Sequence, residues 1–351
     1  MIAYADSDVS RTHLTRLEIA HTNSIYDFEH YPGAKVAVCA IPYPYAGWRG
    51  KDFEHSIDKM LEFSDIIIIL GAELHEFTVD FCLRYQHPKI KYFICGSINS
   101  LNTIPWMDWF ITSTVFYKNN LWVLDQLNPY QNKPKTFDAL LGRPRYHRDV
   151  IYNFVKDHGF VDQTVLTYLQ EDQAIQTQGT DNWIWEDTGL DLPKVNINWT
   201  VTPVKYHGHY MSLSQIIPIS IYNQTAYSVV CETNFFNHFN FYTEKIVKPI
   251  LAERLFLAVA GKHYLKNLRS LGFKTFDGII DETYDTIEDD SLRFKMVCEQ
   301  MQYLYSQPQE EILAKVRPIT EHNRRVMLET DWYKNFTREL QAVLPVQQEQ
   351  N

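Results

Sequence analysis

Three short, continuous apolar runs stand near the amino terminus of the chain. They are KVAVCAI (35–41), DIIIILG (65–71) and KYFICG (91–96), and each is polar only at its ends. Runs of strand length without alternation are typical of strands that are covered on both faces, as in a parallel sheet. Between the first two runs, FEHSIDKML (53–61) carries apolar residues at helical spacing. Strand and helix therefore alternate, which predicts βαβ units and an α/β fold.

The same alternation returns in the second half of the chain. The expected strands there are FDALLG (137–142), YSVVCET (227–233) and LFLAVAG (255–261), with helices between and after them. The stretch 171–226 shows no clear pattern, and NPYQNKPKT (128–136) predicts a linker because proline, asparagine and lysine interrupt the apolar spacing. A length of 351 residues exceeds a typical single core. We therefore expect two α/β domains.

Charge and cysteine usage limit the classes of function. The formal net charge of −10 argues against a protein that coats nucleic acid or anionic membranes non-specifically, although it is compatible with a local basic groove. The five cysteines are scattered and include no C-x-x-C pair, which is typical of reduced thiols in the cytosol. The start lacks a signal-peptide pattern, and no apolar run approaches the roughly 20 residues of a membrane span. We expect a cytoplasmic protein without membrane association, in the host cytoplasm if the source is viral.

A basic cluster follows the first strand of the second half. In LLGRPRYHRD (140–149) the strand ends at Gly142, and Arg143, Arg145, His147 and Arg148 stand at the turn into a helix. Ligands of open α/β sheets bind at the carboxyl ends of strands, and a helix amino terminus favours an anion. Arginine adds a bidentate fork for phosphate. The cluster predicts a phosphate site, with a solvated basic turn or interdomain salt bridges as the alternative.

A second polar cluster surrounds the next strand and helix. Glu232 stands at the carboxyl end of YSVVCET, and Thr243 is a good N-cap that places Glu244 and Lys245 in the first helical turn. A carboxylate there could accept both hydroxyls of a ribose, and the lysine could meet a phosphate. Plain capping of the helix by Glu244 is the alternative.

These motifs resemble the donor site of a known enzyme family. Thr-Glu-Lys, an apolar helix and a strand ending in Gly resemble the donor-binding segment of fucosyltransferase-type GT-B glycosyltransferases, which carry Glu-Asn, Thr-Glu-Lys and Ala-Gly-x-x-Pro-Val. FDALLGRPRYHRD resembles the opening strand of a GT-B carboxyl-terminal domain, where an arginine commonly meets the donor diphosphate. Together the two motifs, within about 137–285, also resemble tailed-phage enzymes that glycosylate hydroxymethylcytosine in DNA, particularly the arabinosyl-transferring ones.

The resemblance implies a fold and a set of donor-site residues. The fold is GT-B, with an acceptor-binding Rossmann-like domain (1–135), a nucleotide-sugar-binding Rossmann-like domain (136–320) and a carboxyl-terminal helix (321–351) packing back on the first. The residues expected at the donor are Arg143, with Arg145 or Arg148, at the diphosphate, Lys245 near the phosphates, Glu244 at the ribose and Asn234 near the sugar. Thr243, the N-cap, is a further donor-binding candidate. Glu232, also near the sugar, is a candidate catalytic residue.

The chain departs from the fucosyltransferase pattern at three places. Its Glu-Asn is Glu232-Thr233-Asn234, its Ala-Gly is Ala252-Glu253, and no proline follows. These differences leave the identity of the sugar open.

Two segments of the first half are candidates for acceptor chemistry. GAELHEF (71–77) places Glu73, His75 and Glu76 at a strand end, where one of them could take the proton of an attacking hydroxyl. An ordinary acidic helix start is the alternative. PYPYAGWRGK (42–51) combines aromatic and basic residues that suit stacking on a base or sugar, with structural packing as the alternative. The residues expected to contact the acceptor are Tyr43, Tyr45, Trp48 and Arg49.

The expected function is therefore transfer of a sugar from a nucleoside diphosphate to a hydroxyl. The resemblance favours a UDP-linked donor, with UDP-arabinose as one candidate, and 5-hydroxymethylcytosine in double-stranded phage DNA as the acceptor. Transfer to a surface glycan or lipopolysaccharide is one alternative, and a non-catalytic nucleotide- or sugar-binding protein is another. We expect no cofactor and no essential metal, because the resemblance implies that arginine, lysine and helix dipoles stabilise the leaving diphosphate. Retention or inversion at the sugar and the oligomeric state stay open.

Overall fold

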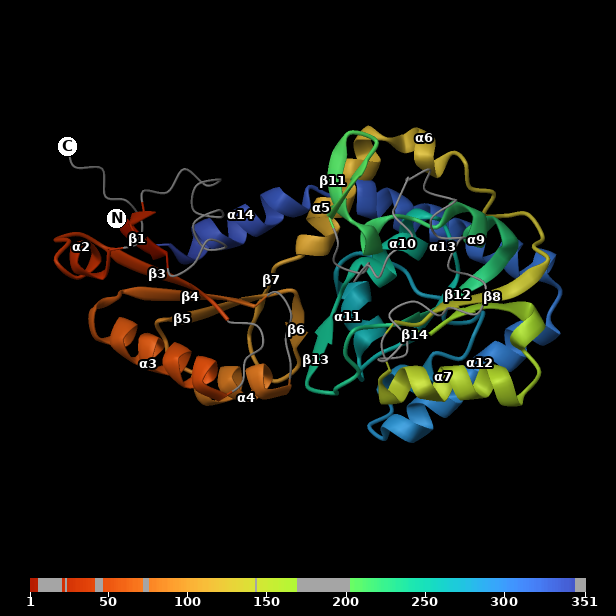
Figure 1. The fold of residues 1–351 in the computed structure, drawn as a ribbon, viewed down its shortest axis with the longest axis horizontal. Coiled ribbons are helices and arrows are strands. Elements are labelled where there is room, and N and C mark those ends of the chain that lie inside the picture. Colours follow the sequence, from red (N-terminus) through yellow and green to blue (C-terminus); the bar gives the residue numbers. More distant parts are fainter. Residues whose placement is uncertain are drawn as a thin grey trace. The chain divides into compact units, whose positions relative to one another are not determined.

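The chain forms two compact α/β units. The computed structural model describes residues 1–5, 21–22, 24–41, 47–71, 76–142, 144–168 and 203–344. The first unit comprises Met1–Asp108 together with Asp331–Asn351, and the second comprises Trp109–Thr330. Each unit contains a parallel sheet and its own helices (Figure 1). The predicted α/β class with parallel sheets is confirmed.

The sheet of the first unit has the order β2-β1-β3-β4-β5-β7, and each neighbouring pair is parallel. Its strands are β1 (Ile2–Ala5), β2 (His21–Thr22), β3 (Lys35–Ala40), β4 (Ile66–Gly71), β5 (Ile90–Ile94) and β7 (Ile104–Pro105), and a short strand β6 (Gly96–Ile98) follows β5. The three central strands are the apolar runs predicted from the sequence. Their side chains are buried on both faces, which is why the runs lack alternation.

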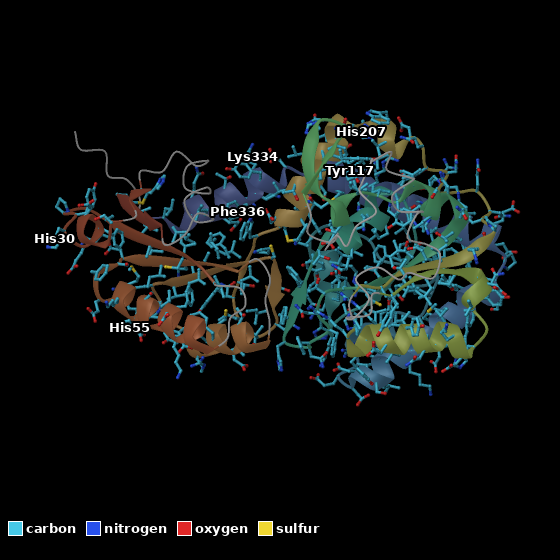
Figure 2. The ribbon with its side chains drawn as sticks, viewed as in Figure 1. His30, His55, Tyr117, His207, Lys334 and Phe336 are labelled. Carbon is cyan, nitrogen blue, oxygen red and sulfur yellow. The ribbon has the colours of Figure 1, made fainter. Side chains whose placement is uncertain are left out.

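Helices cover both faces of this sheet. They are α2 (Ile25–Glu29), α3 (Gly47–Phe63), α4 (Glu76–Arg84) and α14 (Trp332–Val343). In Figure 1, α3 and α4 lie on one face and α14 on the other. Phe336 of α14 packs on the sheet, with its ring 5.6 Å from that of Phe93 and 6.0 Å from that of Trp106. Figure 2 labels this buried ring and the exposed Lys334 on the same helix.

The sheet of the second unit has the order β14-β12-β8-β9, again fully parallel. Its strands are β8 (Lys135–Leu140), β9 (Thr164–Thr167), β12 (Thr225–Cys231) and β14 (Phe256–Val259). The chain runs from β8 outward to β9, and the later strands β12 and β14 lie on the other side of β8. The direction of winding thus reverses between β8 and β12. Such a switch point opens a crevice at the carboxyl ends of the two strands, where ligands of doubly wound sheets bind.

Helices also cover both faces of the second sheet. In Figure 1, α7 (Tyr146–Asp157) and α12 (Asp290–Ser306) lie on one face, and α10 (Glu244–Leu251) and α13 (Gln309–Glu329) lie on the other. The remaining elements are α5 (Asp108–Asn119), α6 (Leu121–Leu124), β10 (Pro203–Tyr206), β11 (His209–Ser212), α9 (Ile219–Gln224), β13 (Phe239–Phe241) and α11 (Tyr264–Ser270). The hairpin β10–β11 packs beside α5, where Phe116 meets Tyr206 at 5.4 Å. Figure 2 labels Tyr117 on α5 and His207 at the hairpin turn.

A buried polar network holds β8 against β12. Arg254 is fully engaged: it donates to Asp138 Oδ2 at 2.6 Å, to Ser228 Oγ at 2.9 Å, and to the carbonyls of Tyr222 and Thr225 at 2.8 Å each. Burial raises the pKa of Asp138, and the guanidinium opposes that rise. Each charge compensates the hydration that the other loses on burial. Removing either side chain alone would therefore leave an uncompensated buried charge and destabilise the fold.

The division of the chain differs from the boundaries expected at 135 and 321. The second unit begins at Trp109, and the segment expected as a linker lies inside it. Several contacts attach that segment; among them, Asn223 Oδ1 accepts from the backbone N–H of Asn128 at 2.9 Å, and Gln309 exchanges two hydrogen bonds with the backbone of Lys133. At the other end, the second unit runs to Thr330, so that α13 belongs to it.

Candidate functional site

The polar residues predicted after two strands of the second unit meet at its switch point. Arg145 and Arg148 follow β8, and residues 232–234 follow β12. The first turn of α10 returns to the same place through Thr243 and Lys245, which hydrogen-bond to residues 232 and 233. We call this set the switch-point cluster: Arg145, Arg148, Glu232, Thr233, Asn234, Thr243, Glu244 and Lys245.

Two guanidinium groups connect the end of β8 to the end of β12. Arg145, the N-cap of α7, donates from Nη1 to the carbonyl of Thr233 and to Asn234 Oδ1, the latter at 3.3 Å. Arg148 is buried and donates from Nη2 to the carbonyl of Glu232 at 3.2 Å. Burial lowers the pKa of Arg148, and the neighbouring Arg145 adds to the effect. Both groups remain cations at neutral pH, because a guanidinium is not deprotonated in proteins.

Glu232 lies at the centre of the switch-point cluster, where its carboxylate hydrogen-bonds to several neighbouring elements. It is 0% exposed. One carboxylate oxygen accepts from the hydroxyl of Tyr264 at 2.7 Å and from the N–H of Thr243 at 3.3 Å. The other accepts from the hydroxyl of Thr243 at 2.7 Å and from the N–H of Thr233 at 3.2 Å. Burial raises the pKa of Glu232, while Lys245 and Thr243 oppose the rise. These bonds join the end of β12 to the starts of α10 and α11.

Thr243 caps α10 as predicted and thereby orients the two charged residues that follow it. Its hydroxyl oxygen accepts from the N–H of Lys245 at 3.2 Å. The ammonium of Lys245 lies 2.7 Å from Glu244 Oε1 and 3.2 Å from Thr233 Oγ1. Burial acts to raise the pKa of Glu244, but Lys245 and Lys248 outweigh it, and the net pKa is lowered. The side chain of Lys245 is 25% exposed, against 8% for that of Glu244, so the ammonium is the more accessible of the two charges.

His147 packs among aromatic side chains and does not act as one of the cations of the site. Its Nε2 lies 2.8 Å from the carbonyl oxygen of Glu232, so this nitrogen carries the proton. The ring packs between Phe235, at 4.8 Å, and Phe294, at 6.1 Å. Burial, reinforced by the adjacent Arg148, lowers the pKa of His147 to about 3. The imidazole is therefore neutral and adds no positive charge to the basic cluster.

The structure brings together six of the seven expected donor residues and Glu232. The six are Arg145, Arg148, Asn234, Thr243, Glu244 and Lys245. Five other expected residues lie outside the described part of the chain: Tyr43, Tyr45, Glu73, His75 and Arg143. Trp48 and Arg49 fall in the first turn of α3, and Glu76 begins α4, but their side chains also lie outside that part.

Three residues of the site region were not predicted from the sequence. Thr233 and Tyr264 supply hydrogen bonds to Lys245 and Glu232, and Gly261 lets the segment after β12 pass close to the end of β14. A Cβ at Gly261 would lie 2.2 Å from the carbonyl oxygen of Phe236. Thr233 and Gly261 end predicted strands, and Tyr264 follows Gly261 by three residues. Their position at strand ends was the available signal.

The cluster can bind an anion. Two guanidinium groups and an ammonium converge beside the amino terminus of α7, whose first N–H groups favour negative charge. Among the described residues, no group of three or more His, Cys, Asp or Glu side chains is placed to hold a metal ion. No described helix combines the length and hydrophobicity that a membrane span requires. No model of a known protein family matches the chain, and no curated protein or solved structure shows significant similarity to it.

Proposed function

We propose that the protein is a glycosyltransferase that uses a nucleoside-diphosphate sugar. One observation carries the proposal: Arg145, Arg148 and Lys245 converge at the switch point of a doubly wound parallel sheet. Three cations gathered at this point suit a ligand with several negative charges, and a diphosphate is such a ligand.

The residues of the switch-point cluster then have distinct roles. Arg145 and Arg148, with Arg143, hold the diphosphate and stabilise the charge that develops on it as the sugar leaves. Lys245 turns from Glu244 to a phosphate oxygen, which frees the carboxylate to accept the ribose hydroxyls. Glu232 does not touch the donor. It positions Thr243 and the start of α10, so we replace its expected catalytic role by a positioning role.

The two α/β units support a GT-B arrangement for the whole enzyme. In this proposal the first unit supplies the acceptor side, with Glu73, His75 or Glu76 as the base and the 42–51 segment as the acceptor contact. The acceptor is a hydroxyl, and 5-hydroxymethylcytosine in DNA is the first candidate. Its support is the resemblance of the two donor motifs, and the net charge of −10 requires any DNA contact to be local.

Ligand-induced thermal stabilisation tests the donor half. UDP-, GDP- and CDP-sugars are added in turn, and the donor should raise the melting temperature, because a ligand that binds the folded state stabilises it. Lys245→Ala should remove most of that shift. Lys295→Ala on α12, where the side chain is 72% exposed, is the matched control and should retain it. If no nucleotide sugar stabilises the wild type, the donor site is refuted.

Transfer assays test the acceptor half. The protein is incubated with the stabilising donor and with hydroxymethylated duplex DNA, unmodified duplex DNA or a glycan, and product mass is measured. We expect transfer to the hydroxymethylated DNA and salt-dependent binding to it. Transfer to the glycan alone would establish the glycan enzyme instead. Binding of the donor without transfer or donor hydrolysis would indicate a non-catalytic binding protein.

A further inference from the structure

We infer that Tyr146 and Phe235 form the surface on which the base of the nucleoside diphosphate stacks. The inference rests on the proposed function and adds to it the part of the site that contacts the base. Tyr146 is the first residue of α7 and is 47% exposed. Phe235 follows Asn234 and is half-buried, and the two ring centroids are 6.1 Å apart.

The aromatic pair directly adjoins the anion-binding groups. Tyr146 follows Arg145 in the chain, and Phe235 follows Asn234, and the guanidinium of Arg145 bonds to Asn234. Each aromatic residue is therefore the chain neighbour of one of the two residues in this hydrogen bond. Consecutive Cα atoms are about 3.8 Å apart. A nucleoside diphosphate carries a flat base and a charged diphosphate on either side of a ribose. The site offers the matching chemistry, with cations and aromatic rings at adjacent residues.

Further aromatic contacts and a hydrogen bond hold this stacking surface in place. Phe235 stacks on Phe236 at 5.1 Å and meets Phe294 edge-on at 5.7 Å. Its carbonyl accepts from Nη2 of the buried Arg293 at 3.1 Å. The ring of Tyr146 lies 5.9 Å from that of Phe294. Because these contacts fix the rings before a ligand arrives, little conformational entropy is lost on stacking.

Exposure separates Tyr146 from the aromatic residues of the core. His147, the next residue, is fully buried against the same two phenylalanines. A ring that served only to pack α7 against its neighbours would be expected to be buried as His147 is. Tyr146 instead leaves about half of its surface accessible, next to a cation. Stacking of a base on such a ring is tolerant of sequence and contributes about tenfold to a hundredfold in affinity.

Calorimetric titration with two kinds of ligand tests the inference. UDP, GDP, CDP and ADP carry a base, whereas inorganic pyrophosphate carries only the charge. Tyr146→Ala should weaken binding of the preferred nucleoside diphosphate about tenfold to a hundredfold and leave pyrophosphate affinity unchanged. Tyr146→Phe retains the ring and should bind as the wild type does. Tyr305→Ala, which removes a 50% exposed ring from α12, is the matched control and should change neither affinity.

The outcomes distinguish this inference from the proposed function. If Lys245→Ala weakens both ligands but Tyr146→Ala weakens neither, the donor site stands and the stacking surface is refuted. If Tyr146→Ala weakens nucleotide and pyrophosphate equally, the ring acts on the anion site and not on the base, which also refutes the inference. If the wild type binds no nucleotide, both the donor site and the stacking surface are refuted. Melting temperatures of all variants establish that each is folded.

Discussion

Acidification should destabilise the protein through His147. In the folded chain burial lowers the pKa of this imidazole from its ordinary value of 6.5 to about 3. The unfolded chain exposes the ring to water and restores the ordinary value. Between the two values the unfolded state binds a proton that the folded state does not, so the free energy of unfolding falls as the pH falls. The full contribution of the neutral ring is present above about pH 6.5.

The magnitude follows from the same two values. Well inside the window the loss is about 1.4 kcal/mol per pH unit. Because the transition is gradual near 6.5, the accumulated loss at pH 5 is about 2 kcal/mol. The result does not depend on the folded-state value in detail, since at pH 5 a ring with a pKa near 3 is almost entirely neutral. The side chain is 0% exposed and lies against the rings of Phe235 and Phe294, so the charged form would lack hydration.

Urea denaturation between about pH 8 and pH 5 measures this effect. The control is His147→Gln, whose amide can still donate to the carbonyl of Glu232 but cannot titrate. The stability difference between wild type and variant should shrink by about 2 kcal/mol over this range. Taking the difference cancels the contribution of the other ionisable groups. A difference that stays constant with pH, or an imidazole NMR signal that titrates near pH 6.5, would refute the reasoning.

Three further substitutions have defined consequences for the free energy of unfolding, measured by urea denaturation. Gly261→Ala should lower it by about 1–3 kcal/mol, because its Cβ would overlap the carbonyl oxygen of Phe236; a loss below about 0.5 kcal/mol would contradict the close approach. Arg254→Met should cost about 3–5 kcal/mol by stranding Asp138, and adding Asp138→Leu should recover part of that loss. Losses that simply add would show that the two side chains are not coupled. His263→Gly should raise the free energy of unfolding by about 0.5–1 kcal/mol, because the φ angle of 66° at this position favours glycine; a decrease would show that the imidazole contributes packing.

The periodic elements could be predicted from the sequence. The runs at 35–41, 65–71 and 91–96 became β3, β4 and β5, and the helix that begins after Thr243 starts at Glu244. These predictions succeeded because burial on both faces leaves a local signal and because an N-cap acts within one turn. The secondary structure of the stretch 203–224, in contrast, could not be predicted from its sequence pattern. It forms a hairpin and a short helix, and its turn at His207 and Gly208 lacks the usual Asn-Gly signal.

The candidate site was predictable only as far as strand ends could be recognised. Residues that follow strands were found, because carboxyl ends of parallel strands share an edge. What each residue does there was not accessible, since it depends on partners distant in the chain. Glu232 looked catalytic by position, but Tyr264, 32 residues later, and Thr243 satisfy its carboxylate. The pair of Asp138 and Arg254 spans 116 residues and leaves no local pattern at all.

The return of the chain to its first unit has a consequence for synthesis. Phe336 and Trp332 of α14 are buried in that unit, and 222 residues of the second unit are translated before they leave the ribosome. Until α14 is made, the rings of Phe93 and Trp106 in the first unit lack the cover that Phe336 gives them. Amino-terminal domains usually complete folding first during translation. In this chain, by contrast, the second unit is translated in full while the first still lacks α14, and a chain that stops before residue 331 would leave these two rings without that cover.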